Sequence, residues 1–204
     1  METDGDGKSA IGATALLVLV VWAMFGCATS TLTKSWRNPD YVGPPLNKVL
    51  VLGVTNDSDL RRSFENQFVK ELGAVRVDAV PSYVALPEAG EADRTQLARA
   101  VREVGANGAL ITRLIRIDVE TEVAPVFLQG AGFYGGYAAA WVGYYNVPVS
   151  HTDTVVLETD LYTFNEPELL SSITTQTVVA DDIQKYLHPF AKLIIDQLKE
   201  QTLI

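Results

Sequence analysis

The chain has very few of the residues that hold metals, form disulfides or bind nucleic acids. It has one cysteine and two histidines in 204 residues, so it cannot form an intramolecular disulfide and lacks the usual ligand set of a zinc site. Basic residues are also in the minority, with 16 Lys and Arg against 25 Asp and Glu and a net charge of −9. This balance argues against nucleic acid and against anionic lipid headgroups as electrostatic partners. We expect no metal and no cofactor.

One uncharged apolar run, from Ile11 to Gly26, stands directly before the single cysteine, Cys27. The run has the length of a signal-peptide core and is shorter than the ~20 residues of a comfortable bilayer span. With a small residue before the cysteine, it resembles the lipobox of bacterial lipoproteins. The resemblance implies a signal peptide over residues 1–26, cleavage between Gly26 and Cys27, and lipidation of Cys27. Stable anchoring takes more than one acyl chain, such as palmitate, and triacylated lipoproteins meet that requirement.

The segment departs from the lipobox pattern at two positions and in its leader. Met24 and Phe25 stand where the family usually has Leu and then Ala or Ser, and the first ten residues carry three acids and one cation, Lys8. Signal peptides normally begin with a net positive charge. An uncleaved transmembrane anchor is therefore the alternative. Since the residue after the cysteine is Ala28 and not Asp, the resemblance favours the outer membrane, with the protein facing the periplasm.

Two further regions follow the predicted signal peptide. Residues 27–47 are polar, contain three prolines and show no apolar period, which predicts a lipidated N-terminus and a flexible tether of roughly 25 Å. Trp36 and Tyr41 are expected to pack onto the domain at its entry. Residues 48–204 are predicted to form a single α/β domain, which is long enough to bury a core.

The hydrophobic pattern predicts how this domain is built. A continuous apolar run at 48–54 is typical of a buried strand, and apolar residues spaced four apart from Leu60 to Leu72 predict a helix after it. The further expected elements are a strand at 75–80, a helix capped by Asp93, a strand from Ala109, strands at 147–164 and 168–179, and a last helix capped by Asp181 and Asp182. Pro189 predicts a kink or restart in that helix.

This order predicts an α/β fold with a mixed sheet. The first three strands and two helices form a β-α-β-α-β core, whose right-handed crossovers make the three strands parallel. A long antiparallel β-hairpin and a C-terminal helix are added to that core.

Residues 129–146, with the sequence QGAGFYGGYAAAWVGYYN, contain small and aromatic residues and no charge. We predict that they form the tip of a hairpin. Aromatic side chains suit protein interfaces and membrane headgroup regions, which indicates a contact surface for a partner or for the membrane. The alternative is a tip that folds back on its own domain. The candidate contact residues are Phe133, Tyr134, Tyr137, Trp141, Tyr144 and Tyr145.

No catalytic constellation is evident. Gly130–Gly135 fits the letters of the dinucleotide-binding motif, but no helix pattern follows it and it does not lie at the first βα turn. Ser150–Asp153 holds nucleophile, base and acid types, but neighbouring strand residues point to opposite faces. Asp57 and Asp59 are better explained as helix-capping residues than as cation ligands. We therefore predict that the protein is not an enzyme.

The chain looks like a group of uncharacterised bacterial envelope lipoproteins, a likeness that covers most of residues 27–204. It is carried by Cys27, by the segments 36–41, 48–54, 61–65 and 80–83, and by the Gly-Tyr-rich stretch. The resemblance implies no functional residue other than Cys27. The architecture is also similar to that of periplasmic accessory proteins, such as activators of peptidoglycan synthases and subunits of the curli secretion pore.

The sequence therefore predicts a lipid-anchored, non-enzymatic interaction or accessory module with an envelope protein as its partner. The alternatives are an oligomeric, pore-like component that inserts residues 129–146 into the membrane, and an envelope hydrolase or ligand-binding protein. The oligomeric state is left open.

Overall fold

The computed structural model describes residues 30–86, 90–116, 132–146, 154–164, 168–178 and 183–204. In chain order the elements are β1 (Ser30–Arg37), β2 (Lys48–Gly53), α2 (Ser58–Ala74), β3 (Asp78–Pro81), the 3-10 turn η1 (Ser82–Val84), α3 (Arg94–Val104), β4 (Gly108–Arg116), α4 (Gly132–Asn146), β5 (Thr154–Thr163), β6 (Glu168–Val178) and α5 (Gln184–Glu200). Within the described part of the chain, no helix is long and apolar enough to cross a bilayer.

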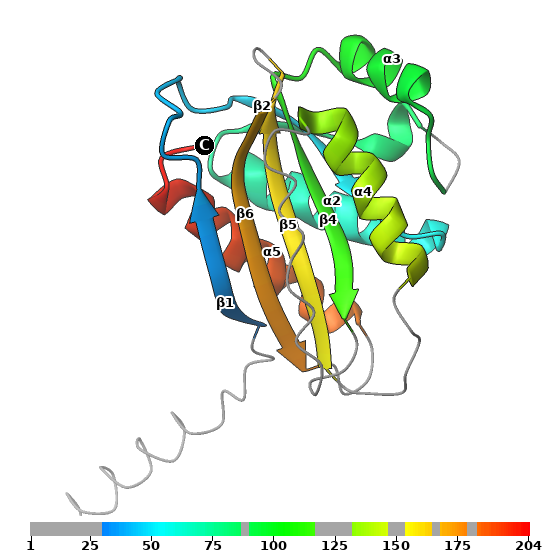
Figure 1. The fold of residues 1–204 in the computed structure, drawn as a ribbon. Helices are drawn as coiled ribbons and strands as arrows, with labels where there is room; N and C mark the ends of the chain where they lie inside the picture. Colours follow the sequence, from blue (N-terminus) through cyan, green and yellow to red (C-terminus); the bar gives the residue numbers. More distant parts are fainter. Residues whose placement is uncertain (1–29, 87–89, 117–131, 147–153, 165–167, 179–182) are drawn as a thin grey trace, which may run out of the picture.

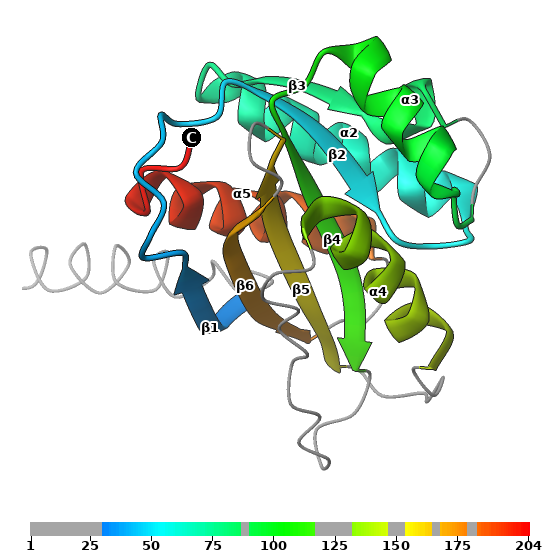
Figure 2. The same ribbon diagram turned by 45° about the horizontal axis from the view of Figure 1, so that its top comes forward.

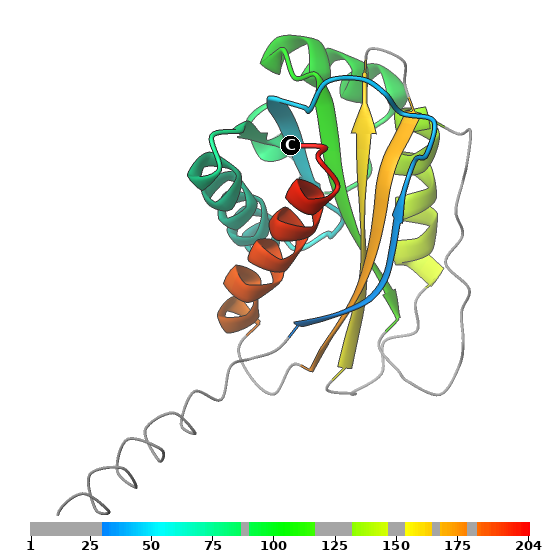
Figure 3. The ribbon, with the colours of Figure 1, turned by 90° about the vertical axis from the view of Figure 1, so that its left-hand side faces the viewer.

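The described strands form one mixed sheet in the order β1-β6-β5-β4-β2-β3. Strands β3, β2 and β4 are parallel, whereas β5, β6 and β1 are added antiparallel to their neighbours. Figures 1 and 3 show helices on both sides of this sheet, with α2 and α5 on one face and α4 on the other. The predicted α/β class, the three parallel strands, the β5–β6 hairpin and the C-terminal helix are confirmed.

The two faces of β2 explain the three layers. Successive strand residues point to opposite sides, and in β2 both sides are apolar. Val49 and Val51 pack in the cluster with α2 and α5, and Leu50 and Leu52 pack in the cluster with α3 and α4. All four side chains are buried, so the sheet needs a helical layer on each face.

Helices α2 and α3 begin where their capping residues predict. The Asp57 carboxylate accepts hydrogen bonds from the backbone amides of Asp59 and Leu60, each at 3.0 Å. Asp93 forms a capping box with Gln96, which satisfies amide groups at the start of α3. Gly105 closes α3 in the left-handed conformation with φ of 61°.

Three local predictions were wrong. Strand β3 starts at Asp78 and not at residue 75, since α2 ends at Ala74 and residues 75–77 form a turn in which Arg76 has φ of 66°. Helix α5 runs through Pro189 as one element, so of the predicted kink or restart the restart does not occur. Its N-cap is Ile183, without a capping side chain, while Asp181 and Asp182 lie outside the described residues.

Strand β1 corrects the prediction of a flexible tether over residues 27–47. Residues Ser30–Arg37 pair with β6 along its length and form an edge of the sheet. As predicted, Trp36 and Tyr41 pack onto the domain, one against each core cluster. A polar segment can form an edge strand because the partner strand satisfies its backbone, and its side chains stay largely in solvent.

Helix α4 corrects the prediction of a hairpin tip at 129–146. Its buried residues lie at the i, i+3, i+4, i+7, i+8 spacing that is typical of a helix packed by one face. They are Phe133, Gly136, Tyr137, Ala140 and Trp141. The pattern was missed because the outward face also lacks charge, and because glycine disfavours isolated helices by ~1 kcal/mol per residue. Packing against the sheet compensates for this cost.

Two glycines allow α4 to approach the sheet. A Cβ atom at Gly136 would overlap the hydroxyl of Tyr162 on β5, and one at Gly143 would lie 3.0 Å from an Arg113 side-chain nitrogen. Glycine at these positions therefore supplies room for the polar tips of two side chains beneath the helix.

We predict that Gly136→Ala destabilises the domain by about 1–3 kcal/mol, the usual cost of overpacking a core. Gly73→Ala is the matched control, since it also lies in a helix and a Cβ there meets nothing within 4 Å. That change should stabilise the protein by about 0.5–1 kcal/mol through helix propensity. Urea denaturation measures both, and equal effects of the two changes would show that α4 does not pack this closely.

Candidate functional site

An apolar pocket of about 350 Å³ lies between the sheet and the helices α2 and α5. It is lined by residues at the end of β2 and in the second half of β4, the strand whose arrowhead points down in Figure 1. Binding sites of open α/β sheets commonly occur at the carboxyl ends of the strands. The lining residues are Gly53, Val54, Thr55, Leu60, Phe64, Thr112, Arg113, Leu114, Val155, Leu157, Thr177, Ile183, Tyr186, Leu187 and Phe190.

The aromatic side chains of α2 and α5 set one wall of the pocket. Phe64, Phe68 and Phe190 contact one another, with ring centroids 4.8 to 6.0 Å apart. Gly53 at the end of β2 permits this arrangement, because a Cβ there would lie 3.1 Å from Phe64. Ile183 at the start of α5 is 37% exposed, so the pocket opens to solvent beside it.

Polar groups around the pocket already have partners. The hydroxyls of Thr112 and Thr159 lie 3.0 Å apart, and those of Thr177 and Ser30 lie 2.7 Å apart. The Thr55 hydroxyl accepts a hydrogen bond from the backbone of Asp57. Arg113 also lines the pocket, but its guanidinium lies beneath α4 on the other face of the sheet and pairs with Glu158. The pocket therefore offers a ligand mainly apolar contacts, which suits an apolar molecule better than a charged one.

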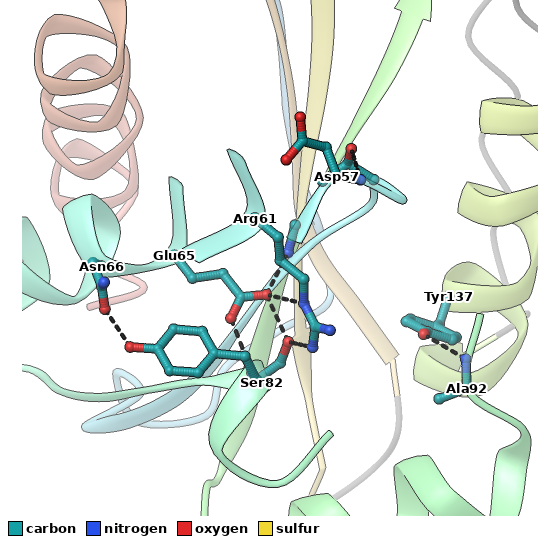
Figure 4. Close-up of polar contacts among 10 residues, drawn as sticks. Asp57, Arg61, Glu65, Asn66, Ser82, Ala92 and Tyr137 are labelled. Atoms are coloured by element: carbon teal, nitrogen blue, oxygen red, sulfur yellow. Dashed lines mark hydrogen bonds and ion pairs between the residues drawn. The ribbon is translucent and has the colours of Figure 1, made fainter. Parts of the chain in front are cut away.

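A buried ion pair supports the end of β2 beside the pocket (Figure 4). Glu65 and Arg61 on α2 are both buried, with the Arg61 Nε atom 3.1 Å from Glu65 Oε1. The same oxygen accepts hydrogen bonds from Ser82 Oγ at 2.6 Å and from the backbone amide of Gly53 at 3.1 Å. The other, Oε2, accepts one from the amide of Tyr83 at 3.1 Å. The network joins α2, β2 and η1, and both Glu65 oxygens are occupied.

A second polar cluster lies on the opposite face of the sheet, beneath α4. Glu158 pairs with Arg113 and accepts a hydrogen bond from Ser172 Oγ at 3.3 Å. Asp160, two residues along β5, lies 3.5 Å from the hydroxyl of Tyr162, and its Oδ1 atom is buried without a hydrogen-bond partner among the described residues. Burial and the nearby Glu158 carboxylate raise the pKa of Asp160 from 3.8 to about 7.

The aromatic residues predicted as a contact surface lie mostly in the core. Phe133, Tyr137 and Trp141 are buried against the sheet, and the Tyr137 hydroxyl accepts a hydrogen bond from the backbone of Ala92 (Figure 4). Tyr134 is half-buried, with the guanidinium of Arg94 4.9 Å from its ring centroid. These four side chains do not form an exposed aromatic tip. Tyr144 and Tyr145 lie in α4, but their side chains are outside the described residues.

The motifs that sequence reasoning set aside show no site either. Gly132 and Gly135 lie inside α4, so a helix does follow the glycines, but it connects the antiparallel neighbours β4 and β5 and not two parallel strands. Asp57 caps α2 as predicted. Residues 150–153, like Gly26 and Cys27, lie outside the described part of the chain. His188 is exposed on α5, 2.8 Å from Glu71. Among the described residues, no group of three potential metal ligands occurs.

Sequence reasoning did not find the apolar pocket, although it identified many of the residues around it. Phe64, Leu187 and Phe190 fall on apolar stripes, which predict helices that pack on a sheet but not a gap between them. One signal in the sequence could have indicated its location. Ligand sites of open α/β sheets lie at the carboxyl ends of the parallel strands, where the following helices begin.

The comparisons with known proteins give little beyond this geometry. No family model matches the sequence, and a search of curated proteins finds no match. Among solved structures, the chain is similar to the PelC dodecamer from Paraburkholderia phytofirmans, with 14% identity and a TM-score of 0.46 over 83% of this chain and 97% of that one. A variant of that dodecamer in a second crystal form gives 14% identity and 0.45, over 83% and 98%. Similarity at this level transfers no function.

We predict that Glu65→Ala destabilises the domain by about 3–5 kcal/mol, since it leaves the positive charge of Arg61 buried without the carboxylate that compensates it. Asp196→Ala is the control, because it breaks an exposed pair with Lys192 at the same i, i+4 spacing and should leave stability unchanged. Chemical denaturation compares the two. Similar losses for both variants would show that the Arg61–Glu65 pair is not desolvated as described.

The raised pKa of Asp160 predicts a stability that falls as the pH rises from 3.8 to about 7. In that window the unfolded chain has released the proton and the folded chain keeps it. The free energy of unfolding therefore falls by at most about 1.4 kcal/mol per pH unit. The groups facing Asp160 are Glu158, Arg113 and Tyr162, and α4 above them carries no charge. Asp160→Asn should reduce the difference between the unfolding free energies at pH 5 and pH 7.5, measured by chemical denaturation. The same pH dependence in the native chain and the variant would contradict the raised pKa of Asp160.

Proposed function

We propose that this chain is a lipid-anchored protein of the bacterial envelope, whose domain is a non-enzymatic binding module that takes an apolar ligand in the apolar pocket. The sequence around Cys27 supports the lipid anchor, and the cavity supports the ligand site. The volume of about 350 Å³ lies within the range of about 300–1,000 Å³ of small-molecule sites. This cavity is the observation that carries the ligand-binding half of the proposal.

The residues around the pocket favour a binding role over catalysis. The hydroxyls of Thr112 and Thr177 are engaged with neighbours, and the carboxylate of Glu65 is fully hydrogen-bonded. The Arg113 guanidinium pairs with Glu158 on the other face of the sheet. A general acid or base needs a group within reach of a substrate, and these groups are held by the protein. The pore-like alternative depended on an aromatic hairpin tip at 129–146, and the helix found there leaves it without that basis.

The pocket can be tested with a fluorescent fatty acid, 11-dansylaminoundecanoic acid. We expect the full chain with Cys27→Ser, held in lipid nanodiscs, to bind this probe through the pocket. Adding Val155→Phe fills part of the cavity and should weaken binding at least tenfold, since excluding two methylene groups costs about 1.6 kcal/mol. Titration of the fluorescence gives the affinities.

Val142→Phe provides the matched control, because Val142 is 62% exposed on α4, on the other face of the sheet. Partition of the probe into the bilayer is the same for both variants, so their difference isolates the pocket. Equal affinity for the two variants would refute an apolar ligand in this cavity.

The anchor has its own test. Mass spectrometry of the protein made in a Gram-negative bacterium should show loss of residues 1–26 and an acylated N-terminal Cys27. The Cys27→Ser variant should keep its N-terminal segment and carry no acyl chain. An unmodified cysteine in the native chain would favour the retained transmembrane anchor instead.

A further inference from the structure

The start of β1 brings the N-terminal end of the described chain to the apolar pocket. In the antiparallel pair of β1 and β6, Ser30 is opposite Thr177, and their hydroxyls lie 2.7 Å apart. Thr177 lines the pocket, and so does Val155, its partner across the β5–β6 pair. The first residue of the sheet is therefore hydrogen-bonded to a residue of the pocket wall.

Chain length then limits how far Cys27 can lie from the pocket. Three residue steps separate Cys27 from Ser30, and a fully extended chain spans at most about 3.6 Å per residue. The Cα atom of Cys27 is thus no more than about 11 Å from that of Ser30. A long flexible tether would have allowed it to move far away, but β1 removes that freedom from residue 30 onward.

Two exposed apolar side chains belong to the elements that begin near the pocket, β1 and α5. Leu32 lies two residues along β1 from Ser30, on the same face of the strand, and is 36% exposed. Ile183 lies at the opening of the pocket and is 37% exposed. Leu32 lies on the strand that starts at Ser30, and Ile183 lines the pocket.

We propose that the apolar pocket holds one of the acyl chains attached to Cys27 of the same molecule. This inference rests on the proposed function, because it takes lipidation of Cys27 as given. An acyl chain is linear and apolar, which fits a cavity whose polar groups are already paired. The volume is more than twice the ~150 Å³ of an engineered apolar cavity that accommodates benzene. A two-residue link gives this chain a high effective concentration at the pocket, an advantage that a free lipid lacks.

The bilayer and the pocket then compete for the same acyl chain. Each buried methylene of an acyl chain contributes about 0.8 kcal/mol to membrane attachment, so a chain withdrawn into the domain weakens the anchor. An apolar ligand that fills the pocket would return the chain to the bilayer. Ligand binding and membrane attachment are coupled in this arrangement through one site.

Photo-crosslinking in the native, lipidated protein tests the occupant. Tyr186, which lines the pocket from α5, is replaced by the photoreactive residue p-benzoylphenylalanine, and the protein is reconstituted in phospholipid vesicles and irradiated. The same residue at Val142, on α4, is the control. We expect a monomeric product in which position 186 is joined to the acylated peptide that begins at Cys27, at least tenfold more abundant than from position 142. Adding Val155→Phe should reduce it at least fivefold.

Each other result overturns the inference and points to a different occupant. A crosslink from position 186 to vesicle phospholipid leaves the pocket as an acyl-chain site but excludes the chain's own lipid. A crosslinked dimer assigns the acyl chain to a second copy. No product above the Val142 control, with an unchanged melting temperature, shows that no acyl chain enters. The fatty-acid titration of the Cys27→Ser chain then decides separately whether the proposed ligand site itself fails.

Discussion

The structure depends on a central sheet whose strand β2 is apolar on both sides. Val49 and Val51 face one side and Leu50 and Leu52 the other, and all four are buried. Such a strand is stable only when both faces are covered, which requires two helical layers (Figure 2). The later helices of the chain supply these two layers. Helices α2 and α5 cover one face, and α3 and α4 cover the other.

The two helical layers meet the sheet in different ways. On the α4 side, glycines at 136 and 143 let the helix come close to a buried cluster of Arg113, Glu158, Asp160 and Tyr162. On the α2 and α5 side, the aromatic residues Phe64 and Phe190 line the apolar pocket at the end of the sheet. One helical layer thus lies close against the sheet, and the other borders a cavity.

The edge strand β1 connects this domain to the predicted anchor. Because it pairs with β6, it ends the freedom of the N-terminal segment at Ser30, beside Thr177 in the pocket wall. Only two residues then separate the predicted lipid anchor, Cys27, from the first residue of the sheet, Ser30. If Cys27 is lipidated, the pocket therefore lies within a few residues of the membrane anchor.

The sequence alone determined the elements whose residues carry their own signals. The buried run of β2, the caps at Asp57 and Asp93, the β5–β6 hairpin and the apolar stripe of α5 follow from periodicity and local hydrogen bonding, which act over a few neighbouring residues. The lipidation of Cys27 is also a sequence prediction, and it lies outside the described residues.

Tertiary structure decided the rest. Ser30–Arg37 has no apolar period and becomes a strand only because β6 offers an unpaired edge. The glycine-rich α4 becomes a helix because the sheet covers its inner face, a contribution that outweighs its low intrinsic propensity. The pocket arises where side chains from five separate elements fail to fill the space between them. Such a gap depends on how the elements pack in three dimensions, which local sequence patterns do not encode.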